Sequence, residues 1–148
     1  MDYRGLAFYR KSPEVVRGVS ALSEHLPRSV QAREISRQLF RASSSVGANI
    51  AEGHGRHAGQ EYIHYLIIAR GSANEVDHWL HTALDCKLGD PQNIQDLITL
   101  NNETRKMLTS TINTLRRQQS GKSLRETLIP YSPIPSSPNP SEEDIQNP

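Results

Sequence analysis

Apolar side chains recur every three or four positions in four segments of the chain, and none shows the alternation typical of a strand. The first segment begins at Ser12-Pro13-Glu14, a typical helix start, and ends before Pro27. The second runs from about Val30 to Glu52, and the fourth from Asp90-Pro91 to about Gln119. Together with the third segment, these patterns predict four helices.

The third segment is the most regular. Its apolar positions follow alternating steps of four and three residues, as in helices that pack knobs into holes. These positions are Tyr62, Leu66, Ala69, Ala73, Val76, Leu80 and Ala83. Asn101 and Arg105 interrupt the stripe of the fourth segment, which predicts a solvated middle for that helix. Short connections favour an all-α, antiparallel up-down-up-down four-helix bundle.

The helical pattern ends at Gly121, and six of the nine prolines lie beyond it. Such a sequence buries too little apolar surface to offset the entropy of ordering. We therefore predict a bundle over residues 1–120 and a disordered Pro-rich tail over residues 121–148. The stretch Tyr131-Ser132-Pro133-Ile134-Pro135 leaves open a polyproline-type docking segment within this tail.

The charge is nearly balanced over the 148 residues, with 17 Lys or Arg against 16 Asp or Glu. Residues 1–120 hold a net charge of +3 and the tail one of −2, which excludes a polycationic coat. Cys86 is the one cysteine, so no intrachain disulfide forms. No apolar run approaches the roughly 20 residues of a membrane span, and the Met1–Gly5 stretch lacks a signal-peptide pattern. We expect a cytoplasmic protein without membrane contact.

Catalytic and metal-binding signatures are weak. The motifs Glu61-x-x-His64 and Glu75-x-x-His78 lie on one predicted helix about 21 Å apart, so they cannot share a metal ion. Nucleophile-elbow, phosphate-loop and dinucleotide signatures are absent. The basic, glycine-rich stretch 53–59 favours a connector over a weak anion site. We expect no enzyme activity, no metal and no cofactor.

Arginine supplies 13 of the 17 basic residues, and Arg33, Arg37 and Arg41 form one stripe on the second helix. Two interpretations stay open. In a hairpin centred near Arg56, the third helix neutralises part of the stripe, with Glu75 opposite Arg37. Alternatively, the stripe faces phosphate groups together with other cations of the chain. These are Arg28, Arg105, Lys106, Arg116 and Arg117.

An apolar excess around the third helix suggests an interface. Ile63, Tyr65, Ile67 and Ile68 make its first turns apolar nearly all round, and Trp79 lies beside the regular stripe. These residues are candidates for a subunit contact, and the alternative is a wide core within one chain.

Three polar or small positions also require an explanation. Glu52 in a last helical turn is disfavoured by the helix dipole, and Arg56 is the local donor that compensates it. Gly71 and Ser72 lower the helix propensity in mid-helix, which predicts a close backbone approach there.

Two stretches resemble the signature of a bacterial four-helix-bundle family known as S23 ribosomal protein or 23S rRNA intervening-sequence protein. They are QLFRASSSVGANIAEG at residues 38–53 and YLIIARGSANEV at residues 65–76, and the resemblance extends over about residues 5–118. The motif residues carried over by position are Arg41, Asn49, Glu52, Gly53, Arg56, Arg70, Gly71, Ser72 and Glu75. Most are expected to support folding and assembly, whereas the arginines, including Arg56 and Arg70, are expected to face a polyanion.

The resemblance implies an antiparallel bundle that assembles into a ring-like homopentamer. The related accessory variability proteins of diversity-generating retroelements share this architecture, bind nucleic acid and dock onto a reverse transcriptase. The expectation is therefore a non-catalytic, oligomeric adaptor for RNA or DNA, with a reverse transcriptase as a candidate partner. The alternative is a protein–protein scaffold of the intervening-sequence type without nucleic-acid contact.

Overall fold

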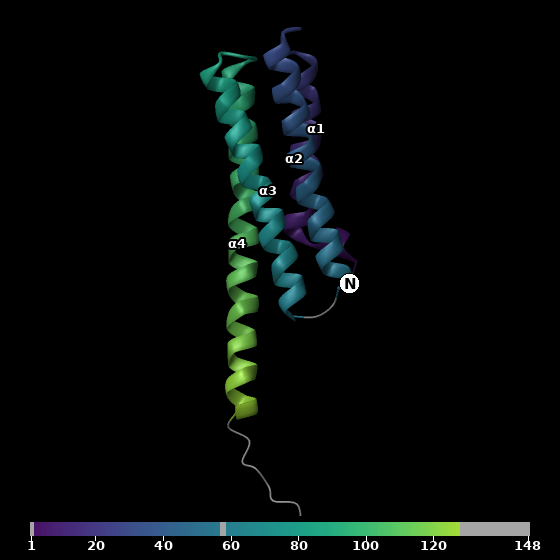
Figure 1. Cartoon of the computed structure of the whole chain (residues 1–148), viewed down its shortest axis with the longest axis vertical. Coiled ribbons are helices and arrows are strands. Elements are labelled where there is room, and N and C mark those ends of the chain that lie inside the picture. The colour runs from purple at the N-terminus through teal and green to yellow at the C-terminus, as the bar shows by residue number, and fades with distance from the viewer. Residues whose placement is uncertain (1, 57–58, 128–148) are drawn as a thin grey trace, which may run out of the picture.

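The protein is an all-α bundle of four helices, described by a computed structural model over residues 2–56 and 59–127 (Figure 1). A short 3₁₀ turn, η1 (Tyr3–Gly5), precedes the helices. The helices are α1 (Ala7–Glu24), α2 (Val30–Gly55), α3 (Gly59–Asp85) and α4 (Pro91–Thr127). Each helix packs against its neighbours in the chain, and α1 also packs against α4, which closes the bundle. The predicted fold class is confirmed.

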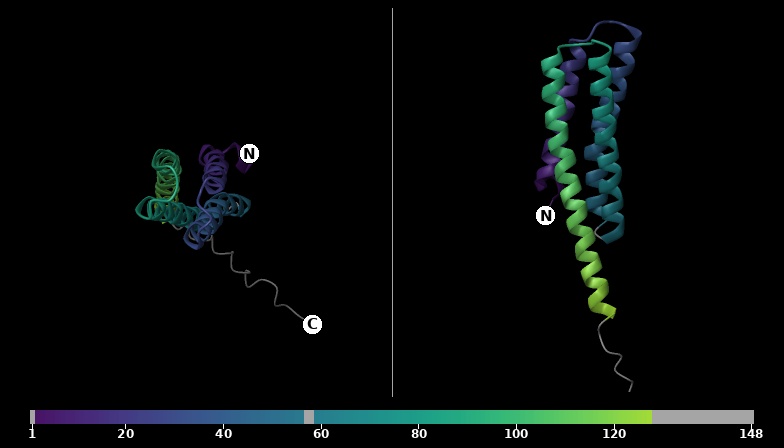
Figure 2. Two further views of the ribbon diagram at one scale, coloured as in Figure 1. Left: turned by 90° about the horizontal axis from the view of Figure 1, so that it is seen from above. Right: turned by 90° about the vertical axis from the view of Figure 1, so that its left-hand side faces the viewer.

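The last helix is longer than expected. α4 continues to Thr127 rather than ending near Gln119, and its C-terminal part extends beyond the other helices (Figure 2). The prediction of disorder from residue 121 is therefore wrong for residues 121–127, which are helical, and residues 128–148 of the predicted tail lie outside the described residues. None of the described helices has the length and apolar content to cross a membrane.

The first helix begins earlier than the sequence pattern suggested. α1 starts at Ala7 and contains Pro13, so the prediction of an N-terminus at Ser12 is wrong. Phe8 in the added turn is 7% exposed and packs in the core, and this burial offsets the backbone hydrogen bond that Pro13 removes. Ser12 is buried and does not cap the helix, and a Cβ built on Gly47 of α2 would lie only 2.5 Å from its hydroxyl oxygen.

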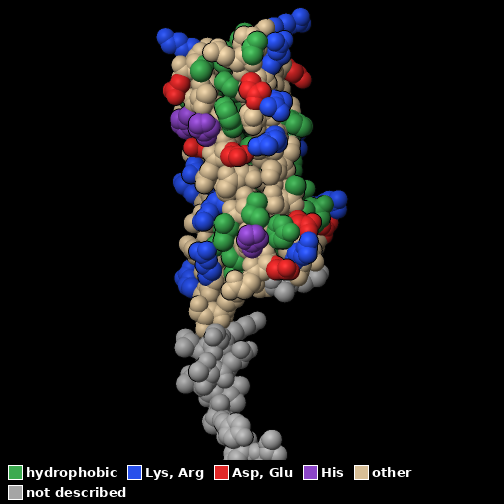
Figure 3. Space-filling model, viewed as in Figure 1, with side chains coloured by type: hydrophobic (Ala, Val, Ile, Leu, Met, Phe, Trp, Pro, Cys, Tyr) green, Lys and Arg blue, Asp and Glu red, His purple; other side chains and the backbone are tan. Residues whose placement is uncertain are grey.

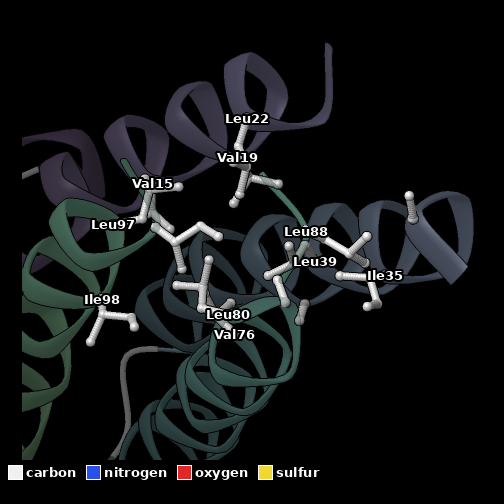
Figure 4. Close-up of a cluster of buried hydrophobic side chains, with 14 residues drawn as sticks. Val15, Val19, Leu22, Ile35, Leu39, Val76, Leu80, Leu88, Leu97 and Ile98 are labelled. Atoms are coloured by element: carbon white, nitrogen blue, oxygen red, sulfur yellow. The ribbon is translucent and has the colours of Figure 1, made fainter. Parts of the chain in front are cut away.

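Two clusters of apolar side chains form the core. The first lies towards the α1–α2 and α3–α4 connections and includes Val19, Leu39, Leu80 and Leu97 (Figure 4). The second lies towards the α2–α3 connection and includes Leu66. All of the predicted α3 stripe is buried except Tyr62, which is half-buried and whose pKa is raised by this burial.

Polar side chains are buried between the two apolar clusters. Asn101 is 1% exposed, and its amide Nδ2 donates a hydrogen bond of 2.8 Å to the carbonyl oxygen of Ala73 on α3. Thr104 is equally buried and bonds to the carbonyl oxygen of Leu100. The expectation of a solvated middle for α4 is therefore wrong at these positions, because the polar groups are satisfied inside the bundle.

The α2–α3 hairpin is closed by a glycine contact. Gly53 lies inside α2, and a Cβ built on it would lie 2.6 Å from the Cβ of Tyr65 on α3. Gly55 is also helical, but a Cβ there would meet nothing within 4 Å. The predicted loop over 53–59 is thus shorter, since α2 continues through Gly55 and α3 begins at Gly59.

These two glycines give a matched test of the hairpin packing. Gly53→Ala should lower the free energy of unfolding by about 1–2 kcal/mol, because the overpacking outweighs the gain in helix propensity. Gly55→Ala should leave stability unchanged or raise it by up to about 1 kcal/mol. Urea unfolding followed by circular dichroism measures both, and equal midpoints for the two variants would contradict the described contact.

Candidate nucleic-acid interface

A polar groove of about 720 Å³ runs between α3 and α4. Four cationic side chains line it: Arg70, Arg105, Lys106 and Arg117. Its other lining residues are neutral and polar, namely Asn74, Asn102, Thr109, Ser110 and Asn113. No carboxylate is among the residues lining this groove. In the space-filling view, Lys and Arg side chains gather along the α4 edge of the molecule (Figure 3).

Helical spacing explains how these side chains converge. On α4, Asn102, Arg105, Thr109, Asn113 and Arg117 follow one another at steps of three or four residues and so share one face. Arg70 and Asn74 do the same on α3. The groove is therefore the seam between one polar face of each helix.

The hydrogen bond from Asn101 to Ala73 sets the register of this seam. Ala73 immediately precedes Asn74 on α3, and Asn101 immediately precedes Asn102 on α4. Because the buried amide must bond to this one carbonyl oxygen, it fixes the position of α4 along the axis of α3. The same contact therefore aligns the cations on the two walls of the groove.

The four groove cations differ in the hydrogen bonds and ion pairs that they form within the chain. The Arg105 guanidinium donates to Oδ1 of Asn102 at 2.8 Å and lies 3.6 Å from the carboxylate of Asp77. Arg70 donates to the hydroxyl of Thr109 at 3.4 Å across the groove. Lys106 and Arg117 form no ion pair with any described residue.

These cations provide a positively charged wall with donors for anionic oxygens. Arg side chains are suited to phosphate because their donors form a planar fork, and Lys adds a mobile point charge. The groove can therefore bind the phosphates of a polyanion.

The α2 arginines lie away from this groove. Arg37 bonds to Glu34 within α2, at 2.8 and 3.2 Å, and this bond lowers the pKa of Glu34. The interpretation in which Glu75 of α3 neutralises Arg37 is therefore wrong at this residue, because Glu34, one turn away on the same helix, is the partner. Arg33 and Arg41 are exposed and have no ion-pair partner among the described residues.

The remaining predicted cations occupy separate places. Arg56 donates to Oε1 of Glu52 at 2.7 and 3.0 Å, which confirms the predicted compensation of that carboxylate. Its guanidinium also lies 5.7 Å from the ring centroid of Tyr65, within cation–π range. Arg116 lines a different depression, beside His64 and Ile67. The predicted cations thus do not form one surface.

A second groove of about 480 Å³ lies between α2 and α3, beside Arg41, Gly71 and Glu75. Ser72 of α3 and Ser45 of α2 face each other there with hydroxyl oxygens 3.0 Å apart.

Two motif residues, Gly71 in this second groove and Asn49 beside it, behave differently from each other. Asn49 donates to the carbonyl and hydroxyl oxygens of Ser45, so this motif residue supports the α2–α3 contact. A Cβ on Gly71 would meet nothing within 4 Å, so the close approach predicted at Gly71 does not occur within the chain.

The predicted interface residues are unequally accessible. Ile63 is 4% exposed inside the core, so the prediction that it is available to a partner is wrong. Tyr65, Ile67 and Trp79 are half-buried. Ile68 is 38% exposed, so of these residues it is the one most open to a partner.

Phe40 was not predicted as an interface residue, although it is 52% exposed. The sequence did contain a sign of this exposure, because Phe40 lies outside the apolar stripe that α2 buries.

Among the described residues, no three His, Cys, Asp or Glu side chains are grouped as a metal site requires.

The sequence pointed to the four cations of the α3–α4 groove but not to the neutral residues that line it. Asn74, Asn102, Thr109, Ser110 and Asn113 were not singled out. These neutral residues lie about one helical turn from the cations. This spacing indicates a shared groove only when the facing helix and its register are known.

The fold and the groove define a small all-α bundle with one basic, carboxylate-free seam. The family model described as 23S rRNA-intervening sequence protein matches residues 4–110, and the chain belongs to this family.

A solved structure is also similar to the chain, with 26% sequence identity and a TM-score of 0.64 over 72% of this chain and 95% of the other. It is a protein of unknown function from the S23 ribosomal protein family of Bacteroides thetaiotaomicron. No curated protein matches the chain.

The register bond offers a direct test of how the groove is built. Asn101→Asp should lower the free energy of unfolding at neutral pH by about 3 kcal/mol, because a buried carboxylate would face a carbonyl oxygen without a donor. Asn113→Asp is the matched control, since this side chain is exposed and should change stability by less than about 0.5 kcal/mol. Chemical unfolding measures both, and equal losses would show that Asn101 does not hold the register.

Proposed function

We propose that the protein is a non-catalytic, oligomeric adaptor that binds nucleic acid through the α3–α4 groove. The observation that carries this proposal is the convergence of Arg70, Arg105, Lys106 and Arg117 along one seam without a lining carboxylate. Cations on one face release counterions when they neutralise phosphates, and this release drives salt-sensitive binding. Because a single chain supplies few such contacts, several copies are needed for tight binding at physiological salt.

The α2–α3 groove supports the oligomeric part of the proposal. Gly71 costs about 1 kcal/mol of helix propensity relative to Ala, yet nothing within the chain approaches it. Arg41 and Glu75 line the same groove without an ion-pair partner among the described residues. The exposed Ile68 and Phe40 lie on the same two helices. A second copy of the chain could approach the backbone closely at Gly71 and supply ion-pair partners for Arg41 and Glu75. The family resemblance favours five copies.

The family resemblance also favours a reverse transcriptase as the protein partner, with the bundle as its accessory factor. A gene for a reverse transcriptase with a variable-repeat target beside this gene would support that role. A position inside a 23S rRNA gene would instead support the intervening-sequence role. A partner retained after nuclease treatment, without nucleic-acid binding, would favour a protein–protein scaffold.

Charge reversal tests the groove against the rest of the basic surface. Lys106→Glu with Arg117→Glu should weaken binding of an RNA stem-loop at least tenfold and lower the salt slope by about 2, because each lost phosphate contact lowers it by about 1. Arg28→Glu with Arg33→Glu changes the net charge equally but lies outside both grooves, so its effect should be several-fold smaller. Fluorescence anisotropy at about 50 mM and about 200 mM salt measures both.

Two outcomes of this experiment would overturn the proposal. Absence of binding by the unaltered protein at low salt would reject nucleic acid as the ligand. Equal losses from the two double variants would show that the groove is not the binding surface.

Gly71 tests the assembly. Gly71→Leu should shift the protein to a smaller species in light scattering while its helical circular dichroism is retained, because the new side chain occupies the contact surface and clashes with nothing inside the chain. Gly121→Leu is the control, since this helical glycine also has nothing within 4 Å. An unchanged mass for Gly71→Leu, or a monomeric unaltered protein, would reject assembly through this groove.

A further inference from the structure

Three neutral side chains of the α3–α4 groove have unused hydrogen-bonding capacity. Asn74, Ser110 and Asn113 are exposed, and within the described part of the chain their side chains form no hydrogen bond. Amide and hydroxyl groups both donate and accept. Binding of phosphate uses donors alone, so these groups suit a ligand that also presents donors between its phosphates.

The positions of these side chains relative to the cations specify the ligand further. Arg105 and Lys106 lie towards one end of the groove and Arg117 at the other, about 17 Å apart along α4 at 1.5 Å per residue. Ser110 and Asn113 lie between them on α4. On α3, the Arg70 guanidinium lies beside Thr109, whereas Asn74 follows Ala73, whose carbonyl oxygen bonds to Asn101, and so lies at the Asn102 end of the groove. Along α4 the order is therefore cation, neutral polar groups, cation, and Asn74 adds a further neutral group at the Asn102 end.

An A-form RNA duplex presents the complementary order. Its wide, shallow minor groove exposes 2′-hydroxyls and base edges, with a row of phosphates on either side. The minor groove of B-DNA is only about 6 Å wide and has no 2′-hydroxyl, so a helix of about 10–12 Å diameter does not enter it. The major groove of DNA admits a helix but likewise offers no hydroxyl groups.

We propose that the α3–α4 groove binds double-stranded RNA across its minor groove, in preference to DNA. Arg105 and Lys106 contact one row of phosphates and Arg117 the other. Ser110 and Asn113 exchange hydrogen bonds with the 2′-hydroxyls between these rows, and Asn74 does so with a 2′-hydroxyl at the Asn102 end of the groove. This inference rests on the proposed function and names the class of nucleic acid that the groove selects.

The test compares an RNA hairpin of about 16 base pairs with a DNA hairpin of the same sequence. Fluorescence anisotropy with the full-length protein gives both affinities and their salt dependence. We expect the RNA to bind at least tenfold more tightly at about 200 mM salt. An RNA hairpin with 2′-deoxy nucleotides throughout its stem on one strand should lose part of this advantage.

A triple variant separates hydroxyl recognition from charge. Asn74→Ala with Ser110→Ala and Asn113→Ala should weaken RNA binding about tenfold, leave DNA binding unchanged and keep the salt slope, because no cation is removed. The control variant carries Gln95→Ala, Thr114→Ala and Gln118→Ala, three exposed polar residues of α4 outside the groove. It should bind both hairpins like the unaltered protein, and circular dichroism verifies that both variants remain helical.

The possible failures are distinguishable. Equal affinity for the two hairpins, or a triple variant that loses RNA and DNA binding equally, would overturn the preference for RNA while leaving the nucleic-acid adaptor intact. Binding of neither hairpin at low salt would overturn the proposed function itself.

Discussion

The hydrogen bond between the Asn101 amide and the Ala73 carbonyl is the constraint on which the α3–α4 groove depends. The apolar clusters on either side of it are built from aliphatic side chains, which pack with little directional preference. A buried amide is satisfied in only one alignment of the helices, and this alignment brings Arg70 and Asn74 opposite the polar face of α4. One buried polar contact thus determines the composition of the exposed groove.

Much of the fold could be predicted because it follows from local patterns. The buried stripe of α3 and the start of α4 at Asp90-Pro91, where Asp90 accepts a hydrogen bond from the Gln92 amide, depend on spacing and capping within one helix. The start of α1 could not be predicted in this way. Burial of Phe8 against other helices outweighs the N-terminal signal at Ser12-Pro13.

The candidate site was predictable only in part, for the same reason. The Glu52–Arg56 pair lies within one helical turn and followed from the sequence. The groove depends on two helices separated by a turn, so its cations could be named but not placed together. Arg37 shows the opposite case, since one of the two open interpretations took Glu75 of the facing helix as its partner, whereas Glu34, one turn away, provides it.

α3 is a wall of both grooves, and the neighbouring residues Arg70 and Gly71 open into different ones. Each residue turns an α-helix by about 100°, so a single inserted or deleted residue within α3 would turn the rest of the helix by that angle and move its side chains out of the grooves that they line. Relatives that keep both surfaces should therefore tolerate substitutions along α3 but not changes in its length. Differences in length between homologous bundles should therefore occur in the connections and at the chain ends. α3 is then the helix on which these bundles can be aligned.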